Sequence, residues 1–421
     1  MAGETLTECT VGDVAAPSRN ALVGGPFGSD LVSRDYVPTG VPVIRGANMG
    51  HGRWVDGEFV YVTPQKADSL SSNCAKPGDL VFTQRGTLGQ VALVPKKGAD
   101  RYLISQSQMK VTLDPTKADA LFLYYVFISA EQQAYIAQNA ITTGVPHTNL
   151  GILRNTPLTL PPLAEQKAIA AVLGALDDKI ELNRRMNATL EAMARALFQS
   201  WFVDFDPVRA KLDGRPPAAL DPATAALFPA TFQDSPLGPI PHGWRTAHLE
   251  EIASVGSGKR PEGRLDLLCP ECNIPLYGGG GRMGYVPSAL YEKPILFTGR
   301  VGTLGLIFRT AEPSWPSDNT LIVEPQTGFF DFTYFVLQGF DLITLNRGST
   351  QPLLTQTDLK RQSFVLPTKD VVKAFADFSE PIFRQIVSNE RESRTLATLR
   401  DTLLPKLLSG ELSVAECQQE D

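Results

Sequence analysis

The sequence predicts an α+β protein in which two mixed domains are separated by two long helices, paired as an antiparallel coiled coil. The first observation is an internal repeat, because Gly86-Thr87-Leu88-Gly89 recurs as Gly302-Thr303-Leu304-Gly305. A Phe-Thr pair and an arginine precede each copy, Phe82-Thr83 and Arg85 in the first and Phe297-Thr298 and Arg300 in the second. The second is that each copy is followed by a long segment whose apolar residues recur every three or four positions. Such a duplication gives two similar surfaces held apart by two similar helices, which suits a target that itself has two parts.

The first domain, residues 1–160, is expected to be rich in short strands. Runs of β-branched or aromatic residues bounded by glycine and proline occur at 41–46, 79–83 and 90–94, and one helix is expected from Ala118 to Gln138. The second domain, residues 241–366, repeats this order. Its strand candidates are 274–277, 294–298, 306–308 and 320–323, followed by an aromatic run at 329–340 that matches the helix.

Two long helices are predicted at 161–202 and 367–412. Each carries an asparagine near its middle, Asn183 and Asn389, and a polar residue in a coiled-coil seam lowers stability but fixes register. The alternative is that each helix lies separately on its own domain. We favour pairing, because each helix is too long for a small domain to cover. Antiparallel pairing would place the two domains at opposite ends. The seam positions are Ile169, Leu173, Leu176, Ile180, Met186, Leu190, Met193 and Leu197, and then Phe375, Phe378, Ile382, Ile386, Leu396, Leu399, Leu403 and Leu407.

The acidity of the chain lies in its connecting segments. The formal net charge is −6, yet residues 1–160 hold 13 acidic and 13 basic residues, and residues 241–366 hold 12 and 11. The excess acid falls in the proline-rich connector 203–240, expected to be an extended strap, and in the tail 413–421. Electrostatics alone therefore leaves nucleic-acid binding undecided.

Composition and terminal sequence indicate an intracellular protein without a membrane segment. No run of about 18 uncharged apolar residues occurs, and the N-terminus lacks the basic and apolar regions of a signal peptide. The five scattered cysteines do not form a disulfide framework. We expect reduced thiols and a location in the cytoplasm of a prokaryotic cell.

Motifs for catalysis and for metal binding are missing from the sequence. It contains no Asn/Asp-Pro-Pro-Tyr/Phe motif and no glycine-rich cofactor loop of the kind found in adenine methyltransferases. The segment Gly256–Arg260 resembles a phosphate loop but lacks the leading glycine and the hydroxyl residue after lysine, so it is interpreted as a flexible turn. Cys269 and Cys272 form a lone CxxC, for which a metal is possible but not favoured. No catalytic residue, metal or cofactor is assigned to this chain.

The remaining polar residues near glycine-containing loops favour binding to DNA. Arginine can bind guanine and asparagine or glutamine can bind adenine in a bidentate manner, while hydroxyls reach phosphates. For any one residue a role in the fold is as plausible. We expect the two repeated turns to hold the fold, and sequence reading to lie where the copies diverge, as in 23–30 against 256–264. The DNA-binding candidates are Arg45, Asn48, Gln84, Arg85, Thr87, Gln106, Gln108, Thr142, Thr143, His147 and Asn149, and then Arg282, Arg300, Thr303, Asn319, Arg347, Ser349 and Gln351.

Several motifs together resemble the specificity subunits of type I restriction–modification systems. They lie at 160–170, 176–183 and 198–208, at the entry to the second domain (235–244), and at 399–410. The resemblance covers essentially the whole chain. It implies that both domains are target-recognition domains, each reading half of a bipartite double-stranded DNA site, and that the paired helices set the spacing between the half-sites.

The same resemblance implies that the chain is a non-catalytic subunit with enzyme partners. It would dock two methyltransferase subunits that modify adenine with S-adenosylmethionine, and through them restriction/translocase subunits that use ATP and Mg²⁺. Glu165, Gln166, Trp201 and Phe202 are the docking candidates, since buried aromatic residues suit stable interfaces. The first helix begins with the Pro-Leu-Ala-Glu-Gln signature at 162–166, whereas the second helix departs from the pattern and has Thr-Lys-Asp-Val-Val at 368–372. The alternatives are a protein-interaction scaffold with a duplicated binding domain and, less favoured, a self-contained nuclease or methyltransferase.

Overall fold

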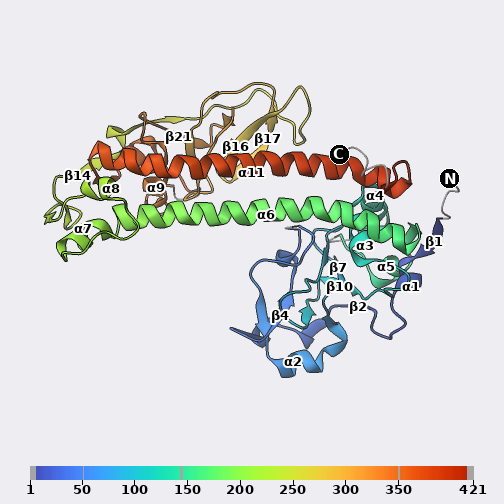
Figure 1. Cartoon of the computed structure of the whole chain (residues 1–421). Helices are drawn as coiled ribbons and strands as arrows, with labels where there is room; N and C mark the ends of the chain where they lie inside the picture. The colour runs from blue at the N-terminus through green and yellow to red at the C-terminus, as the bar shows by residue number, and fades with distance from the viewer. Residues whose placement is uncertain (1–5, 51, 143–145, 349–350, 415–421) are drawn as a thin grey trace. The chain divides into compact units, whose positions relative to one another are not determined.

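A computed structural model describes residues 6–50, 52–142, 146–348 and 351–414 of the chain (Figure 1). The chain divides into two compact units. The first unit contains the residues up to 182 together with those from 392 onward, and the second contains residues 183–391. Each unit therefore holds one mixed domain and a part of both long helices.

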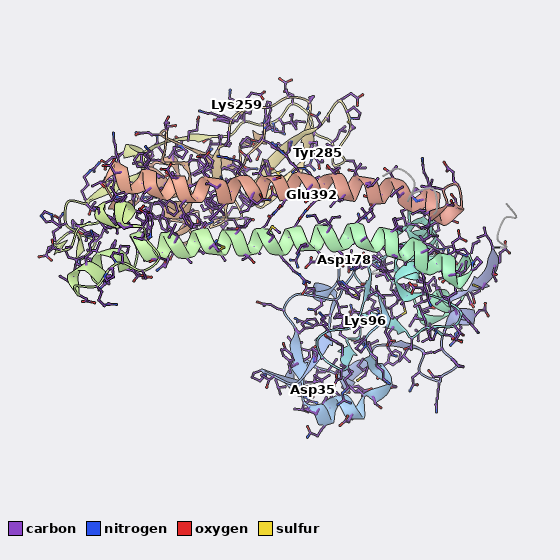
Figure 2. The ribbon with its side chains drawn as sticks, in the orientation of Figure 1. Asp35, Lys96, Asp178, Lys259, Tyr285 and Glu392 are labelled. Carbon is purple, nitrogen blue, oxygen red and sulfur yellow. The ribbon has the colours of Figure 1, made fainter. Side chains whose placement is uncertain are left out.

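The long helices are α6 (Leu163–Phe202) and α11 (Lys369–Ser409), and they pair antiparallel within each unit. In the first unit Arg400 donates to Asp177 at 2.7 Å and Lys179 forms an ion pair with Glu392 at 3.2 Å. Figure 2 marks Glu392 on α11 and Asp178, beside Asp177, on α6. The residue numbers rise on α6 as they fall on α11, so the expected antiparallel pairing is confirmed.

A layer of amides continues this pairing in the second unit. The Asn183 amide donates to the Asn389 carbonyl at 3.4 Å, and the Asn389 side chain donates to Oδ1 of Asn187 at 2.7 Å. Asn183 and Asn389 are both buried, which places the two predicted seam asparagines against each other.

Among the described residues, no helix is long and apolar enough to cross a membrane.

Replacing Asn389 alone by leucine is expected to lower the free energy of unfolding by about 1 kcal/mol, because Asn187 and Gln385 both lose a hydrogen-bond partner. Replacing Asn187 and Asn389 together by leucine is expected to recover the part of this loss that comes from Asn187, since an apolar pair suits a coiled-coil seam, while the bond from Gln385 stays lost. Urea unfolding of the parent and both variants measures the effect. Equal stabilities of the two variants would show that the amides are not coupled.

The described residues of the first domain form three sheets whose strands come from distant parts of the sequence. Strand β1 (Thr7–Thr10) pairs antiparallel with β11 (Pro157–Leu160). A four-stranded sheet has the order β2 (Leu22–Gly24), β10 (Gln108–Val111), β7 (Leu80–Thr83) and β8 (Val91–Leu93). A five-stranded sheet has the order β3 (Tyr36–Val37), β5 (Val60–Val62), β4 (Val41–Ile44), β9 (Tyr102–Ile104) and β6 (Cys74–Ala75).

Short helices complete the first domain. The single helix predicted at Ala118–Gln138 is two helices, α3 (Ala120–Ile128) and α4 (Ala130–Asn139). The break falls at Ser129, whose backbone is extended and whose side chain caps α4 by accepting a hydrogen bond from the Gln132 amide. The remaining helices are α1 (Val11–Val14), α2 (Pro64–Ser69) and α5 (Leu150–Arg154).

The second domain repeats part of this plan. Strand β14 (Arg245–His248) pairs with β22 (Ser363–Leu366), and α9 (Phe330–Gln338) and α10 (Gln356–Lys360) take the places of α3 and α5. The four-stranded sheet has the order β15 (Ala253–Ser257), β21 (Thr320–Pro325), β18 (Leu296–Gly299) and β19 (Ile307–Arg309). The other sheet differs, with only β17 (Gly281–Val286), β16 (Ile274–Gly278) and β20 (Trp315–Pro316) among the described strands.

Strand register corrects the alignment of the two copies by one residue. Phe82 pairs with Val91, two residues after Gly89, whereas Thr298 pairs with Ile307, two residues after Gly305. Thr298 therefore occupies the place of Phe82, although the sequence suggested that the two Phe-Thr pairs correspond. By the same register Gln84 corresponds to Arg300, so Arg85 and Arg300 are not equivalent.

The connector 203–240 is folded, contrary to the extended strap predicted from its prolines. It contains α7 (Asp206–Leu212) and α8 (Pro222–Ala226), and then β12 (Phe232–Gln233), which pairs with β13 (Ile240–Pro241). Phe205, Val208 and Phe228 are buried in the aromatic core of the second unit. Apolar residues spaced between the prolines thus anchor the connector to that core.

Candidate nucleic-acid interface

Four segments of the first domain meet at one end of its four-stranded sheet. They are the loop after β2 (25–30), the β7–β8 turn (84–90), the segment before β10 (105–107), and the described residues of 141–149, and we call them the first loop cluster. Backbone amides join them: Gln84 donates to the Ser107 carbonyl at 2.7 Å and Thr148 donates to the Gln84 carbonyl at 2.9 Å. These segments are distant in sequence, so the sheet brings their polar residues together.

Glycine sets how closely the segments of the first loop cluster approach. The Gly25 amide donates to the Gln108 carbonyl at 2.8 Å, and a Cβ at Gly25 would lie only 1.9 Å from the Ser105 carbonyl oxygen. In the repeated turn, Gly86 and Gly89 have φ angles of 101° and 86°, which residues other than glycine rarely adopt. The glycines of the first repeat therefore shape the backbone, as the sequence suggested.

The second domain builds the same frame from equivalent residues. We define the second loop cluster as 258–268, 300–306, 317–319 and the described residues of 347–354. The Arg300 amide donates to the Asn319 carbonyl at 2.8 Å and the Leu354 amide donates to the Arg300 carbonyl at 2.9 Å. A Cβ at Gly258 would lie 2.1 Å from the Ser317 carbonyl oxygen, which mirrors Gly25 and Ser105.

The second loop cluster contains a hollow of about 320 Å³. Its lining includes two exposed arginines from the loop after β15, together with amide, carboxylate, hydroxyl and thioether side chains. The loop is held by Trp315, whose indole nitrogen donates to the Lys259 carbonyl at 2.7 Å. The lining residues are Arg260, Pro261, Gly263, Arg264, Leu276, Met283, Ser317, Asp318 and Asn319. Paired arginines beside an asparagine can bind phosphates and base edges.

Comparison with known proteins identifies the family. The family model described as the type I restriction modification DNA specificity domain matches residues 34–192 and again residues 241–396. The chain belongs to this family. The two matches coincide with the two halves of the repeat, and membership implies DNA target recognition by a non-catalytic specificity subunit. Such a subunit assembles with other subunits and with DNA.

Relatives in both archaea and bacteria are similar along most of their length. The specificity subunit of the type I restriction enzyme MjaIX of Methanocaldococcus jannaschii is 24% identical over 391 residues, covering 85% of each chain. That of HindI of Haemophilus influenzae is 26% identical over 406 residues, covering 80% of this chain and 87% of the relative. The crystal structure of a type I S subunit from M. genitalium has a TM-score of 0.58 at 19% identity, covering 97% of both chains, and so shares the fold.

The structure sorts the sequence-predicted DNA candidates of the first domain by exposure. Asn48 and Gln108 are fully buried. The Asn48 side chain accepts a hydrogen bond from the Arg45 amide and donates to the carbonyls of Asp56 and Glu58. Asn48 therefore stabilises a loop and is not exposed to DNA. Gln108 contacts Ser105, which lies in the segment before β10. Arg45, Gln84, His147 and Asn149 are half-buried, and Arg85, Thr87, Gln106 and Thr142 are exposed, while Thr143 lies outside the described residues.

Most candidates in the second domain lie in or beside the second loop cluster. Arg347 differs from the other candidates because its guanidinium already forms an ion pair with the Asp358 carboxylate, to which two of its nitrogens donate at 2.7 and 2.5 Å. Arg300 is half-buried, and Ser349 lies outside the described residues. Arg282, Thr303, Asn319 and Gln351 are exposed. Arg260 and Arg264 were not among the DNA-binding candidates chosen from the sequence. The segment that contains them, 256–264, had been predicted to read DNA because it diverges from 23–30.

Three of the four docking candidates have internal roles. The Gln166 side chain is 1% exposed, donates to the Pro161 carbonyl at 2.9 Å and accepts from the Asp119 amide at 3.0 Å, so it joins α6 to the first domain. Trp201 and Phe202 are buried among the aromatic residues of the second unit. Glu165 is half-buried. Gln166, Trp201 and Phe202 are therefore engaged within this chain, and a role of the four residues in docking stays a prediction.

The CxxC segment forms a tight turn. The backbone amides of Cys269 and Cys272 each donate to the other's carbonyl, at 3.2 and 3.1 Å. Partial desolvation raises the pKa of the Cys272 thiol, and the adjacent Cys269 thiol raises it further. Within the described ranges no group of three or more potential metal ligands is present. The pair alone does not supply the four ligands that a structural zinc ion requires.

Proposed function

We propose that this specificity subunit reads a bipartite double-stranded DNA site, with one loop cluster contacting each half-site. The observation that carries this proposal is the duplicated frame. In both clusters, corresponding segments are joined by the same pattern of backbone hydrogen bonds, and a glycine lies close to a serine carbonyl. The exposed side chains of the two clusters differ, and so do the sheets that accompany the four-stranded sheet in each domain. A common frame with different reading groups suits two different half-sites, and α6 with α11 would fix the spacing between them.

The same proposal includes the enzyme partners. The subunit would dock two methyltransferase subunits, which flip out and methylate adenine with S-adenosylmethionine, and through them restriction subunits that use ATP and Mg²⁺. Family membership supports this assembly. The alternative is a scaffold whose domains bind protein, for which affinity would be insensitive to salt, whereas phosphate contacts make DNA affinity fall steeply with salt.

Sequencing of methylated adenine in DNA exposed to this chain with its cognate methyltransferase tests the proposal. We expect methylation at one gapped, two-part motif. A complex that assembles with an active methyltransferase but methylates no such motif would favour the scaffold.

Arg260→Ala together with Arg264→Ala is expected to relax the sequence requirement in one half-site, because bidentate base contacts are worth about 1–3 kcal/mol each. The other half-site should remain as specific as in the parent. Arg215→Ala, which removes an exposed arginine of the connector paired with Asp213, is the matched control. Unchanged specificity in the double variant would remove the hollow from the recognition surface.

A further inference from the structure

Two large apolar side chains stand out by their exposure. Phe27 in the first domain and Leu267 in the second are each 82% exposed, more than any other exposed large hydrophobic residue in the described part of the chain. Leu268, beside Leu267, is 62% exposed. Single exposed apolar residues are common on protein surfaces, so the place of these two residues in the duplicated fold, and not their exposure alone, carries the inference.

Phe27 and Leu267 occupy corresponding loops of the duplicated domains. Phe27 follows β2, the edge strand that pairs with β10, and Leu267 lies in the loop after β15, the edge strand that pairs with β21. Each loop begins at a glycine, Gly25 or Gly258, that lies against a serine carbonyl of the neighbouring segment. The two loops differ in sequence and in length, yet each presents one highly exposed apolar residue.

Both loop clusters contain basic groups, but they are placed differently around the two apolar residues. The loop of Phe27 contains Asp30 and no lysine or arginine, so the exposed Arg85 of the β7–β8 turn is the basic group that the first loop cluster supplies. The loop of Leu267 also carries Lys259, Arg260 and Arg264, and two backbone hydrogen bonds between Leu265 and Tyr285, at 2.8 and 3.0 Å, fix it to β17. Figure 2 marks Lys259 and Tyr285 in this domain. The loop of Phe27 joins the first loop cluster through Gly25. An apolar group among cationic groups suits insertion between the bases of DNA, whose phosphates the cations bind.

We propose that Phe27 and Leu267 are apolar wedges, each of which enters a groove of its own half-site and partly unstacks one base step. This inference rests on the proposed function and adds a deformation of DNA to it. Unstacking a base step is unfavourable, and this cost is offset by contacts that the bent duplex makes with the rest of the loop cluster. Recognition would then depend on the flexibility of the contacted step as well as on base contacts.

The test uses the full chain in complex with its methyltransferase, on a duplex carrying the motif found by methylation sequencing. 2-Aminopurine is placed in turn at each position other than the methylated adenines. We expect the parent complex to raise fluorescence at one step in each half-site. Phe27→Ala should remove the signal in one half-site and Leu267→Ala the signal in the other. Each should weaken binding about tenfold without changing the salt dependence, because no phosphate contact is lost.

Leu212→Ala is the matched control, since Leu212 is 58% exposed on α7 of the connector, and it should behave as the parent. Phe27→Leu should retain most of the signal. Parent-like fluorescence and affinity in either alanine variant overturns the shared wedge role. Loss of methyltransferase assembly with either variant, measured by sedimentation, overturns it in favour of a protein-docking role. Failure of the proposed function is recognised separately, because the parent complex would then yield no two-part motif.

Discussion

Replacing Gly25 or Gly258 by alanine is expected to weaken recognition of one half-site by about tenfold or more and to leave recognition of the other half-site unchanged. The new methyl group would lie 1.9 Å from the Ser105 carbonyl oxygen or 2.1 Å from that of Ser317, so the backbone must move. The shift also breaks the amide hydrogen bond from the glycine to the strand that pairs with it. Overpacking of this kind costs about 1–3 kcal/mol or more, which corresponds to roughly a tenfold to hundredfold loss of binding. Methylation of DNA with either half-site scrambled measures which half is lost.

Neighbouring glycines give matched controls for both variants. Gly256 lies two residues before Gly258 and has open space where a Cβ would be placed, and Gly24 has only ordinary contacts at 3.6 and 3.8 Å. Gly256→Ala and Gly24→Ala should therefore keep both half-sites. If Gly258→Ala and Gly256→Ala methylate the same sites equally well, the close approach does not position the second loop cluster.

The sequence predicted the repeated architecture because periodicity and turn residues are local signals. The strands near the repeated turns, the aromatic helix of each domain and the two long helices all appear where these signals occur. Asn183 and Asn389 could be placed in the seam because a polar residue within an apolar repeat is visible in the sequence. Their mutual contact followed from antiparallel pairing.

Residues whose role depends on tertiary burial could not be assigned in the same way. Trp201 and Phe202 are residue types that are common in interfaces, but they pack with apolar residues of the folded connector. The many prolines of the connector led to the prediction of an extended strap, although apolar residues between them pack into the core. Asn48 has the chemistry of an adenine contact, yet backbone groups from 56 and 58 occupy its amide. Exposure likewise depends on neighbours that are distant in sequence, which is why Phe27 and Leu267 were not foreseen.

Asp331→Ala is expected to destabilise the second unit by about 3–5 kcal/mol, the usual cost of removing one partner from a buried ion pair. Asp331 on α9 accepts from Arg309 at 3.0 Å and from the Ser379 hydroxyl on α11 at 2.7 Å, and its side chain is 8% exposed. Burial lowers the pKa of the Arg309 guanidinium, and Asp331 opposes that effect. Without Asp331, the Arg309 guanidinium, 3.5 Å from the centre of the Phe383 ring, would lose its ion-pair partner and keep only the weaker attraction of Glu191. Urea unfolding followed by tryptophan fluorescence measures the loss.

Two milder variants separate the buried charge from ordinary contacts. Ser379→Ala removes one hydrogen bond to the same carboxylate and should cost about 1 kcal/mol. Arg384→Ala removes an exposed ion pair with Glu380 on the same face of α11 and should cost less than about 0.5 kcal/mol. Replacing Arg309 by methionine and Asp331 by leucine together should recover most of the stability, because an apolar pair leaves no buried charge. If the double variant is as unstable as Asp331→Ala, packing of α9 against α11, and not the unpaired charge of Arg309, determines the stability of this joint.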